Sequence, residues 1–151
     1  MLQCVAEGIL LVILVLIGVA DTKEKRIPNR LLLVMLADAI LACLLQGQLR
    51  FWDRLLGSLL VCGILLFIRF LKAGAFGAGD IKLLAVSGLY LGVGKNLMAL
   101  VIGVLLAGIF CVTGILMKRI DRESEIPFGP FLCAGIALSM YCGEALLYWF
   151  L

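Results

Sequence analysis

The feature that most limits what this chain can fold into is a series of long apolar runs separated by short charged connections. Hydrophobic residues make up 64% of its 151 residues, charged residues make up 15%, and the mean hydropathy is +1.20. A helix crosses the hydrocarbon core of a bilayer with about 20 apolar residues, and about 17 suffice. Because the runs are continuously apolar and lack the alternation of barrel strands, they predict transmembrane helices and exclude an ordinary soluble domain.

We therefore predict an all-α polytopic membrane protein with six transmembrane helices in a single membrane-embedded domain, residues 1–151. Residues 18–20, Gly-Val-Ala, are similar to a signal-peptide cleavage site, but no basic residue precedes the first run, so we expect that run to remain as a span. The second and fourth runs are short for a span. The six predicted spans are Leu2 to Ala20, Leu31 to Leu45, Leu55 to Leu71, Ile81 to Val93, Leu97 to Met117 and Phe128 to Phe150.

The distribution of basic residues predicts the orientation of these spans. Ten of the 13 Lys and Arg residues fall in the first, third and fifth connections or at the adjoining ends of the spans, and the second and fourth carry only Arg50, Arg54 and Lys95. Cytoplasmic connections are enriched in Lys and Arg, so the odd-numbered connections are predicted to be cytoplasmic and both termini to lie outside. The net charge of +3 is explained by these topology anchors and by attraction to anionic lipid in the bilayer, and it requires no nucleic-acid partner.

Two aspartates at the ends of apolar runs, Asp21 and Asp80, are the main candidates for chemistry. A carboxylate near membrane depth is costly and tends to be retained for catalysis, ion passage or pairing with a cation. Two predicted spans separate Asp21 from Asp80, so both should lie at the same, cytoplasmic, boundary. If the two carboxylates approach one another, they share a proton, and one can activate water while the other polarises a peptide carbonyl.

Three segments of the chain resemble a known family. Residues 21–29 (Asp-Thr-Lys-Glu-Lys-Arg-Ile-Pro-Asn) and residues 77–85 (Gly-Ala-Gly-Asp-Ile-Lys-Leu-Leu-Ala) are similar to the two active-site signatures of type IV prepilin peptidases. The second is the GxGD element, which presenilin-type intramembrane proteases share more loosely. Residues 126–131 (Ile-Pro-Phe-Gly-Pro-Phe) are similar to a third family segment, at the start of the last span.

The resemblance implies a GxGD-type aspartyl endopeptidase of the bacterial cytoplasmic membrane. Such an enzyme removes the short basic leader from prepilins or pseudopilins, whose next segment is an apolar helix. By carry-over from the family, Asp21 and Asp80 are the catalytic pair. The dyad mechanism needs neither a metal nor another cofactor.

Several neighbours of the two aspartates are candidates for supporting roles. Gly77 and Gly79 would let the backbone or a bound peptide approach Asp80 closely, although glycine also serves helix packing in membranes. Lys82 either tunes Asp80 or extends toward the lipid surface. Pro28 and Asn29 are predicted to start the second span, Pro28 at an early helical position. The last segment supplies a possible border of the substrate cleft, formed by Pro127, Phe128, Gly129 and Pro130.

The cysteines mark a departure from larger members of the family. Those members carry a cytoplasmic insert with paired Cys-x-x-Cys motifs and are credited with N-methylating the new amino terminus. In this chain no Cys-x-x-Cys spacing and no histidine occurs, so we expect neither structural zinc nor methylation. The six cysteines are expected to be apolar packing residues: Cys4, Cys43, Cys62, Cys111, Cys133 and Cys142.

Two other classes of function remain open at this point. In a small proton-coupled transporter or channel subunit, Asp21, Asp38 and Asp80 would form a relay, which requires carboxylates staggered in depth. Only Asp38 is predicted to lie deeper than the boundary. A non-catalytic assembly scaffold would tolerate Asn at either Asp21 or Asp80, whereas a protease would not.

Overall fold

The computed structural model describes residues 2–45, 51–72, 76–118 and 127–150. The sequence-based assignments at Arg50, Arg119, Arg122 and Ile126 lie outside these residues. Within them the chain forms six helices, in agreement with the all-helical prediction. The helices are α1 (Leu2–Glu24), α2 (Asn29–Leu45), α3 (Phe51–Leu71), α4 (Ala78–Leu91), α5 (Val93–Leu116) and α6 (Gly129–Phe150).

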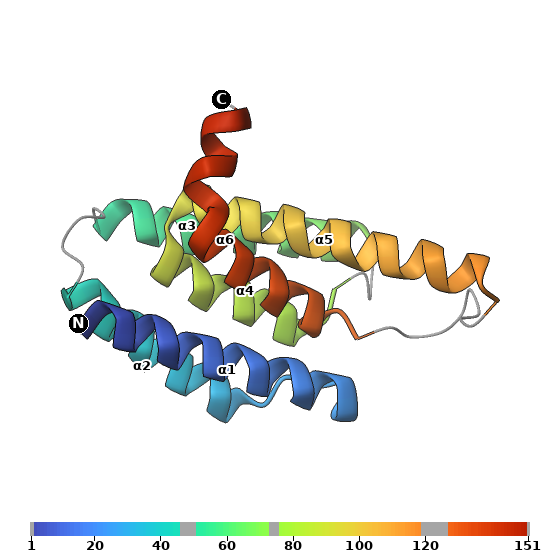
Figure 1. Ribbon diagram of the computed structural model, residues 1–151, viewed down its shortest axis with the longest axis horizontal. Coiled ribbons are helices and arrows are strands. Elements are labelled where there is room, and N and C mark those ends of the chain that lie inside the picture. The colour runs from blue at the N-terminus through green and yellow to red at the C-terminus, as the bar shows by residue number, and fades with distance from the viewer. Residues whose placement is uncertain (1, 46–50, 73–75, 119–126, 151) are drawn as a thin grey trace.

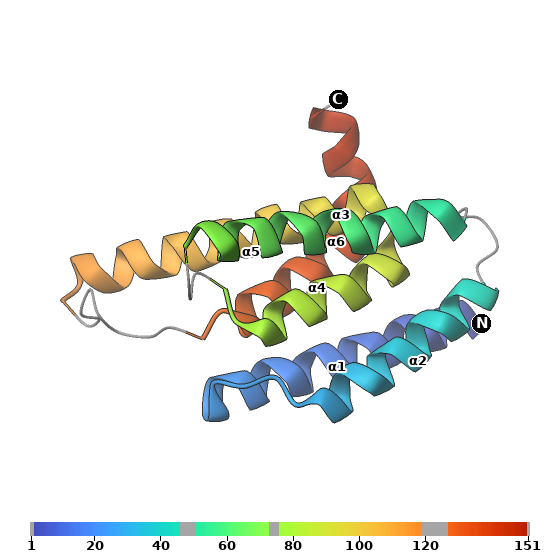
Figure 2. The same cartoon turned by 180° about the vertical axis from the view of Figure 1, so that it is seen from behind.

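The helices form three stacked layers of two helices each. Figures 1 and 2 show α1 beside α2 in one outer layer, α4 and α6 in the middle, and α3 with α5 in the other outer layer. The C-terminal part of α6 turns away from the bundle (Figure 1). Because successive helices run in alternating directions, the end of α1 and the starts of α4 and α6 meet at one end of the bundle, at the right of Figure 1.

Helix α4 is the central element, and it contacts α2, α3, α5 and α6. Its buried residues lie around most of its circumference, as a helix surrounded by other helices requires. Two glycines bring its backbone against that of α3: a Cβ added at Gly88 would lie 2.5 Å from the backbone nitrogen of Ser58, and one at Gly57 would lie 2.6 Å from the carbonyl carbon of Gly92. Small residues of this kind permit close helix packing in membranes.

A buried polar cluster also joins α3, α4 and α5. The side-chain amide of Asn96 donates hydrogen bonds of 3.0 Å to the carbonyl oxygens of Gly57 and Leu84 and accepts one of 2.7 Å from the hydroxyl of Ser87. Asn96 and Ser87 are both fully buried. The hydrogen bonds offset the cost of burying these polar groups, so the cluster fixes the relative positions of the three helices.

The predicted boundary between the fourth and fifth spans is wrong. Helix α4 ends at Leu91 and α5 begins at Val93, so a single residue, Gly92, separates them. Gly92 has φ 79° and ψ −179°, a backbone conformation that essentially only glycine adopts. The residues next to Gly92 are apolar, and the nearest charged residue, Lys95, lies three positions further on, so hydropathy placed the connection too far along the chain.

The start of the chain also differs from the prediction. Helix α1 continues to Glu24, beyond the predicted end at Ala20, and closes with Lys25 in the left-handed region at φ 50°. Asp21 therefore lies in the last helical turn, not in the connection. Pro28 precedes α2 instead of lying within it, and its carbonyl oxygen accepts the backbone N–H groups of Leu31 at 3.1 Å and Leu32 at 3.4 Å.

Apolar side chains cover much of the outer surface of the bundle. Among the described residues, three helices are long and apolar enough to cross a membrane, over Val5–Glu24, Phe51–Leu71 and Val93–Leu116, and a shorter apolar helix covers Gly129–Gly143. Large side chains on their outer faces, such as Val12, Phe67 and Leu105, remain about 60% exposed. An apolar helix that the protein itself leaves so exposed is one that lipid covers, so the chain is a membrane protein.

Candidate functional site

The carboxylates of Asp21 and Asp80 both lie at the end of the bundle where α1 ends and α4 begins. Only 6% of Asp21 and 8% of Asp80 is exposed. The two groups are close enough that the negative charge of Asp21 acts on the carboxyl group of Asp80. The structure thus brings together two buried carboxylates from different helices.

Asp80 is held by the start of its own helix. It is the third residue of α4, and its Oδ2 accepts a hydrogen bond of 3.2 Å from the backbone N–H of Gly77, which precedes the helix. The first N–H groups of a helix have no partner within the helix, and a carboxylate near them is stabilised by the hydrogen bond and by the helix dipole. This contact fixes the carboxylate at the mouth of the bundle.

Asp21 is held in the same manner by a different helix. Its Oδ2 accepts a hydrogen bond of 2.9 Å from the backbone N–H of Gly129, the first residue of α6. A Cβ added at Gly129 would lie 2.5 Å from this oxygen, so no larger residue fits without displacing the carboxylate. Each of the two carboxylates is therefore anchored by a glycine N–H at a helix N-terminus.

The environment of Asp80 favours its protonated form. Asp80 precedes the predicted fourth span, and burial, followed by the negative charge of Asp21, raises its pKa from 3.8 to about 6. The hydrogen bond from Gly77 acts in the opposite direction because it stabilises the ionised form. A proton is thus retained in this site at a pH where an exposed aspartate has lost it.

The two glycines before Asp80 have separate structural roles. Gly77 has φ −66° and ψ 148°, which any residue can adopt, and a Cβ there would lie 3.1 Å from Oδ2 of Asp80. A Cβ at Gly79 would lie 3.0 Å from Cβ of Ile27, in the connection that follows Asp21. Gly77 therefore leaves room for the carboxylate, and Gly79 lets the start of α4 approach the segment after α1.

Lys82 and Asn29 contact one another. The ammonium group of Lys82 donates a hydrogen bond of 3.3 Å to Oδ1 of Asn29, and both residues are exposed. Lys82 is therefore directed toward the start of α2, and neither of the two roles considered for it from the sequence included this contact. The pair joins α4 to α2 beside the carboxylates.

The segment before α6 lies against the same site. The ring of Phe128 packs edge-on against that of Phe76, with 5.3 Å between the ring centroids, and Pro127 is half-buried. Phe76 immediately precedes Gly77, so this contact joins the starts of α4 and α6. Sequence reasoning did not identify Phe76 or Ile27, because neither carries a polar group that signals a site.

Asp38 lies apart from the two carboxylates. It is 5% exposed, and among the described residues its Oδ2 has no hydrogen-bond partner. It lies nine residues beyond the start of α2, about 14 Å along the helix from the end of the bundle that holds Asp21 and Asp80. The three aspartates therefore do not form one cluster. No group of three or more His, Cys, Asp or Glu residues that could hold a metal ion lies within the described part of the chain.

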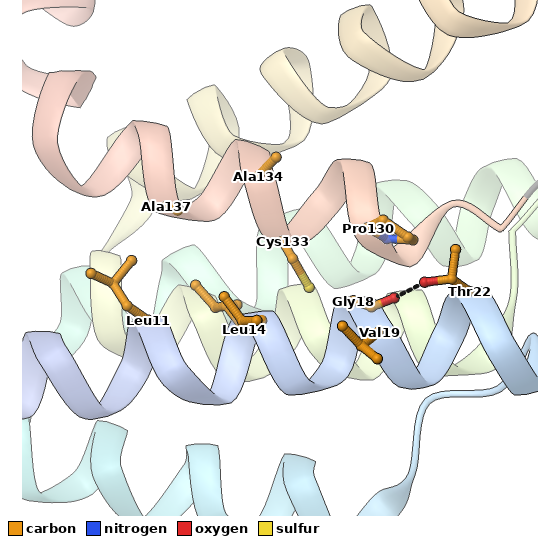
Figure 3. A pocket seen from close by; sticks show the side chains of 10 residues that line it. Leu11, Leu14, Gly18, Val19, Thr22, Pro130, Cys133, Ala134 and Ala137 are labelled. Atoms are coloured by element: carbon orange, nitrogen blue, oxygen red, sulfur yellow. Dashed lines mark hydrogen bonds between the residues drawn. The ribbon is translucent and has the colours of Figure 1, made fainter.

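A groove of about 380 Å³ between α1 and α6 begins beside the carboxylates. At that end it is lined by Thr22, which follows Asp21, and by Pro130, which follows Gly129 (Figure 3). The side chain of Cys133 points from α6 toward α1. The other lining residues are Leu11, Leu14, Val15, Gly18, Val19, Ala134 and Ala137.

Fold and site together define a helical membrane protein with two buried carboxylates at the end of the bundle where α1 ends and where α4 and α6 begin. The type IV leader peptidase family model matches residues 8–112, a range that contains both aspartates. The chain belongs to this family, and the resemblance inferred from the three sequence segments is confirmed. No solved structure matches the chain.

Curated relatives carry the name prepilin leader peptidase/N-methyltransferase. That of Bacillus subtilis (strain 168) is 30% identical over 135 residues, which cover 89% of this chain and 54% of the relative. That of Aeromonas salmonicida (strain A449) is 30% identical over 144 residues, covering 92% of this chain and 50% of the relative. The chain thus spans about half the length of these relatives.

Proposed function

We propose that this protein is an aspartyl endopeptidase that cleaves the basic leader from type IV prepilin or pseudopilin precursors at the cytoplasmic face of the membrane. The single observation that carries the proposal is that Asp21 and Asp80 are both buried at the same end of the bundle and that each accepts a hydrogen bond from a glycine N–H at a helix start. Membership of a peptidase family and the names of the relatives support the reaction and the substrate class. The proposal concerns peptidase activity alone.

In the proposed mechanism the two carboxylates share one proton. The ionised carboxylate takes a proton from a water molecule as the water oxygen attacks the carbonyl carbon of the scissile peptide bond. The protonated carboxyl group donates its proton to the carbonyl oxygen, which gives a neutral tetrahedral intermediate. When the intermediate collapses, the C–N bond breaks, the amine leaving group gains a proton from the carboxyl group that took it from water, and the shared proton returns to the pair. The pair acts as a unit, so neither residue is assigned a permanent role as acid or base.

The basic residues also bear on how the chain crosses the membrane. We infer six membrane spans in one domain, both termini outside, in a multi-pass protein of the bacterial cytoplasmic membrane. The asymmetry of Lys and Arg residues supports this orientation. The end of the bundle that holds Asp21 and Asp80 also carries exposed basic residues at Lys23, Arg30 and Lys82, consistent with a cytoplasmic mouth.

Replacing each aspartate by asparagine in the purified protein, in lipid, tests the proposal. The readout is cleavage of a prepilin-like peptide with a basic leader and an apolar segment. Asp21→Asn and Asp80→Asn should each abolish cleavage. In either variant only one carboxyl group remains, and it cannot act alone as both base toward water and acid toward the substrate. Asp38→Asn is the matched control: it removes an equally buried carboxyl group away from the pair and should retain cleavage. Retained cleavage in either Asp21→Asn or Asp80→Asn would refute the dyad.

A further inference from the structure

The groove between α1 and α6 has no part in the dyad chemistry, yet one end of it opens at the dyad. Its lining residues include no charged side chain, and its polar hydroxyl, that of Thr22, is already donated to the carbonyl oxygen of Gly18 (Figure 3). A ligand held there therefore has to be apolar along the groove. The residues that line it on α1 run from Leu11 to Thr22, about 16 Å at the rise of an α-helix, which matches about three helical turns.

Gly18 leaves space in the groove, and the packing of α1 on α6 does not require a glycine there. A Cβ added at Gly18 would lie 3.6 Å from Cα of Pro130 and 4.0 Å from Cβ of Cys133, which are ordinary contacts. Alanine would thus fit at Gly18, in contrast to Gly129, where a Cβ would collide with Asp21. Together with Ala134 and Ala137, Gly18 forms a shallow surface of the kind that lets another helix approach closely in a membrane.

We propose that this groove binds the apolar helical segment of the substrate that follows the scissile bond. The inference rests on the proposed peptidase function and deepens it. A helix lying in the groove would end beside Thr22 and Pro130, so the chain that continues from it would reach Asp21 directly. Binding energy from the apolar segment would in this way position the peptide bond between the two carboxylates.

Cys133 provides a direct test because its thiol lines the groove. In one enzyme variant Cys133 is retained and the other five cysteines become alanine, and in a matched control Cys111 on α5 is the one retained. Both variants also carry Asp80→Asn so that the substrate is not consumed. A prepilin-like peptide with one cysteine at successive positions of its apolar segment is added in lipid under mild oxidation.

The expected result is a disulfide between the peptide and Cys133, with a yield that varies with helical periodicity along the peptide and exceeds that of Cys111 severalfold. Equal yields for the two variants, or no peptide crosslink to Cys133, would overturn the groove as the docking site. Disulfides between two enzyme copies through Cys133 in the presence of the peptide would likewise overturn it, because a second copy would then occupy the groove.

Cleavage measured separately distinguishes this inference from the proposed function. The enzyme with Cys133 as its single cysteine and Asp80 intact should cleave the cysteine-free peptide. Cleavage without a crosslink to Cys133 would refute the groove and leave the peptidase function standing. A crosslink to Cys133 without cleavage by this enzyme or by the wild type would support the groove and refute the peptidase function.

A second variant tests the groove without crosslinking. Gly18→Leu would fill the groove one helical turn from Thr22, near the end that opens beside Asp21. Gly8→Leu places the same side chain on the same helix, at a position where an added Cβ has nothing within 4 Å. Gly18→Leu should raise KM by about tenfold or more, because the leucine side chain would take the space of the substrate segment. Gly8→Leu should leave KM unchanged, and a peptide that lacks the apolar segment should be cleaved equally by both variants. An unchanged KM in a folded Gly18→Leu enzyme would overturn the proposal.

Discussion

The carboxylate of Asp21 accepts a hydrogen bond from the backbone N–H of Gly129, which lies 108 residues further along the chain. Asp80 accepts the equivalent bond from Gly77, only three residues before it. The two carboxylates are thus placed by the N-termini of two different helices, one distant and one local. The candidate site depends on the position of α6 as much as on the two segments that carry the aspartates.

Replacing Gly129 by alanine should impair cleavage, because the added Cβ would lie 2.5 Å from Oδ2 of Asp21. A hydrogen bond to a charged group contributes about 1.5–3 kcal/mol, so its loss should lower kcat/KM by about tenfold or more. Peptide cleavage measured at several substrate concentrations checks this.

The matched control is Gly108→Ala, because Gly108 lies on α5 and a Cβ there has nothing within 4 Å. This variant should cleave as the wild type does. If Gly129→Ala also kept wild-type kcat/KM, the hydrogen bond from α6 would have no role in positioning Asp21.

The titration of Asp80 should depend on Asp21. The pKa of Asp80 is raised to about 6 by burial and then by the negative charge of Asp21. Replacing Asp21 by asparagine removes that charge, so the pKa of Asp80 should fall, yet stay above 3.8 because the burial remains. Carboxyl NMR of the protein labelled with ¹³C at aspartate Cγ, recorded across the pH range, measures the change.

In the same experiment Asp53→Asn serves as the control, since Asp53 lies on α3 and is not among the groups that shift Asp80. It should leave the titration of Asp80 unaltered. An Asp80 pKa that did not move in Asp21→Asn would mean that the two carboxylates are not electrostatically coupled.

The contact between Lys82 and Asn29 should have a small effect on cleavage, and this effect should be lost when either residue is replaced. The hydrogen bond is 3.3 Å long and exposed, and exposed charged contacts contribute roughly 0.2–1 kcal/mol. Lys82→Met and Asn29→Leu should therefore each lower kcat/KM by less than about fivefold, and the double variant should lose no more than the larger single loss.

Lys23→Met, which removes another exposed cation near the site, is the control for a general effect of charge. An equal loss in Lys23→Met would assign the effect to charge instead of to the contact. Additive losses in the double variant would show that Lys82 and Asn29 act independently.

The sequence was sufficient to predict the helices, because they follow from local patterns, and it singled out Asp21 and Asp80 as candidates for one site. Long apolar runs can form only helices in a bilayer, and the parity of the spans places Asp21 and Asp80 at one end. The hydrogen bond between Asp21 and Gly129 could not be predicted, because nothing in hydropathy says which helix ends touch. The same is true of Phe76 and Phe128, whose contact joins two segments that are each unremarkable alone.

The ends of the helices were predicted less well than their existence, for a physical reason. A helix ends where its backbone hydrogen bonds end, and lipid exposure does not mark that point. Helix α1 continues through charged residues to Glu24, and the chain turns at Gly92, between the apolar residues Leu91 and Val93 and three residues before Lys95. Gly92 is one of 17 glycines, and only its φ of 79° distinguishes it as the residue at which the chain reverses.

Stability should depend strongly on Asn96, whose side chain bonds to Gly57, Leu84 and Ser87 from three different positions in the fold. Replacing it by alanine would leave buried partners unsatisfied in addition to opening a small cavity. We expect a loss of about 2–4 kcal/mol in the free energy of unfolding, more than a single polar contact between membrane helices contributes.

Reversible unfolding in mixed detergent micelles measures this loss. Thr113→Val is the control, because the hydroxyl of Thr113 bonds within α5, to the carbonyl oxygens of Ile109 and Phe110, and its removal should change stability by less than about 0.5 kcal/mol. Similar losses in the two variants would show that the buried cluster does not hold α3, α4 and α5 together.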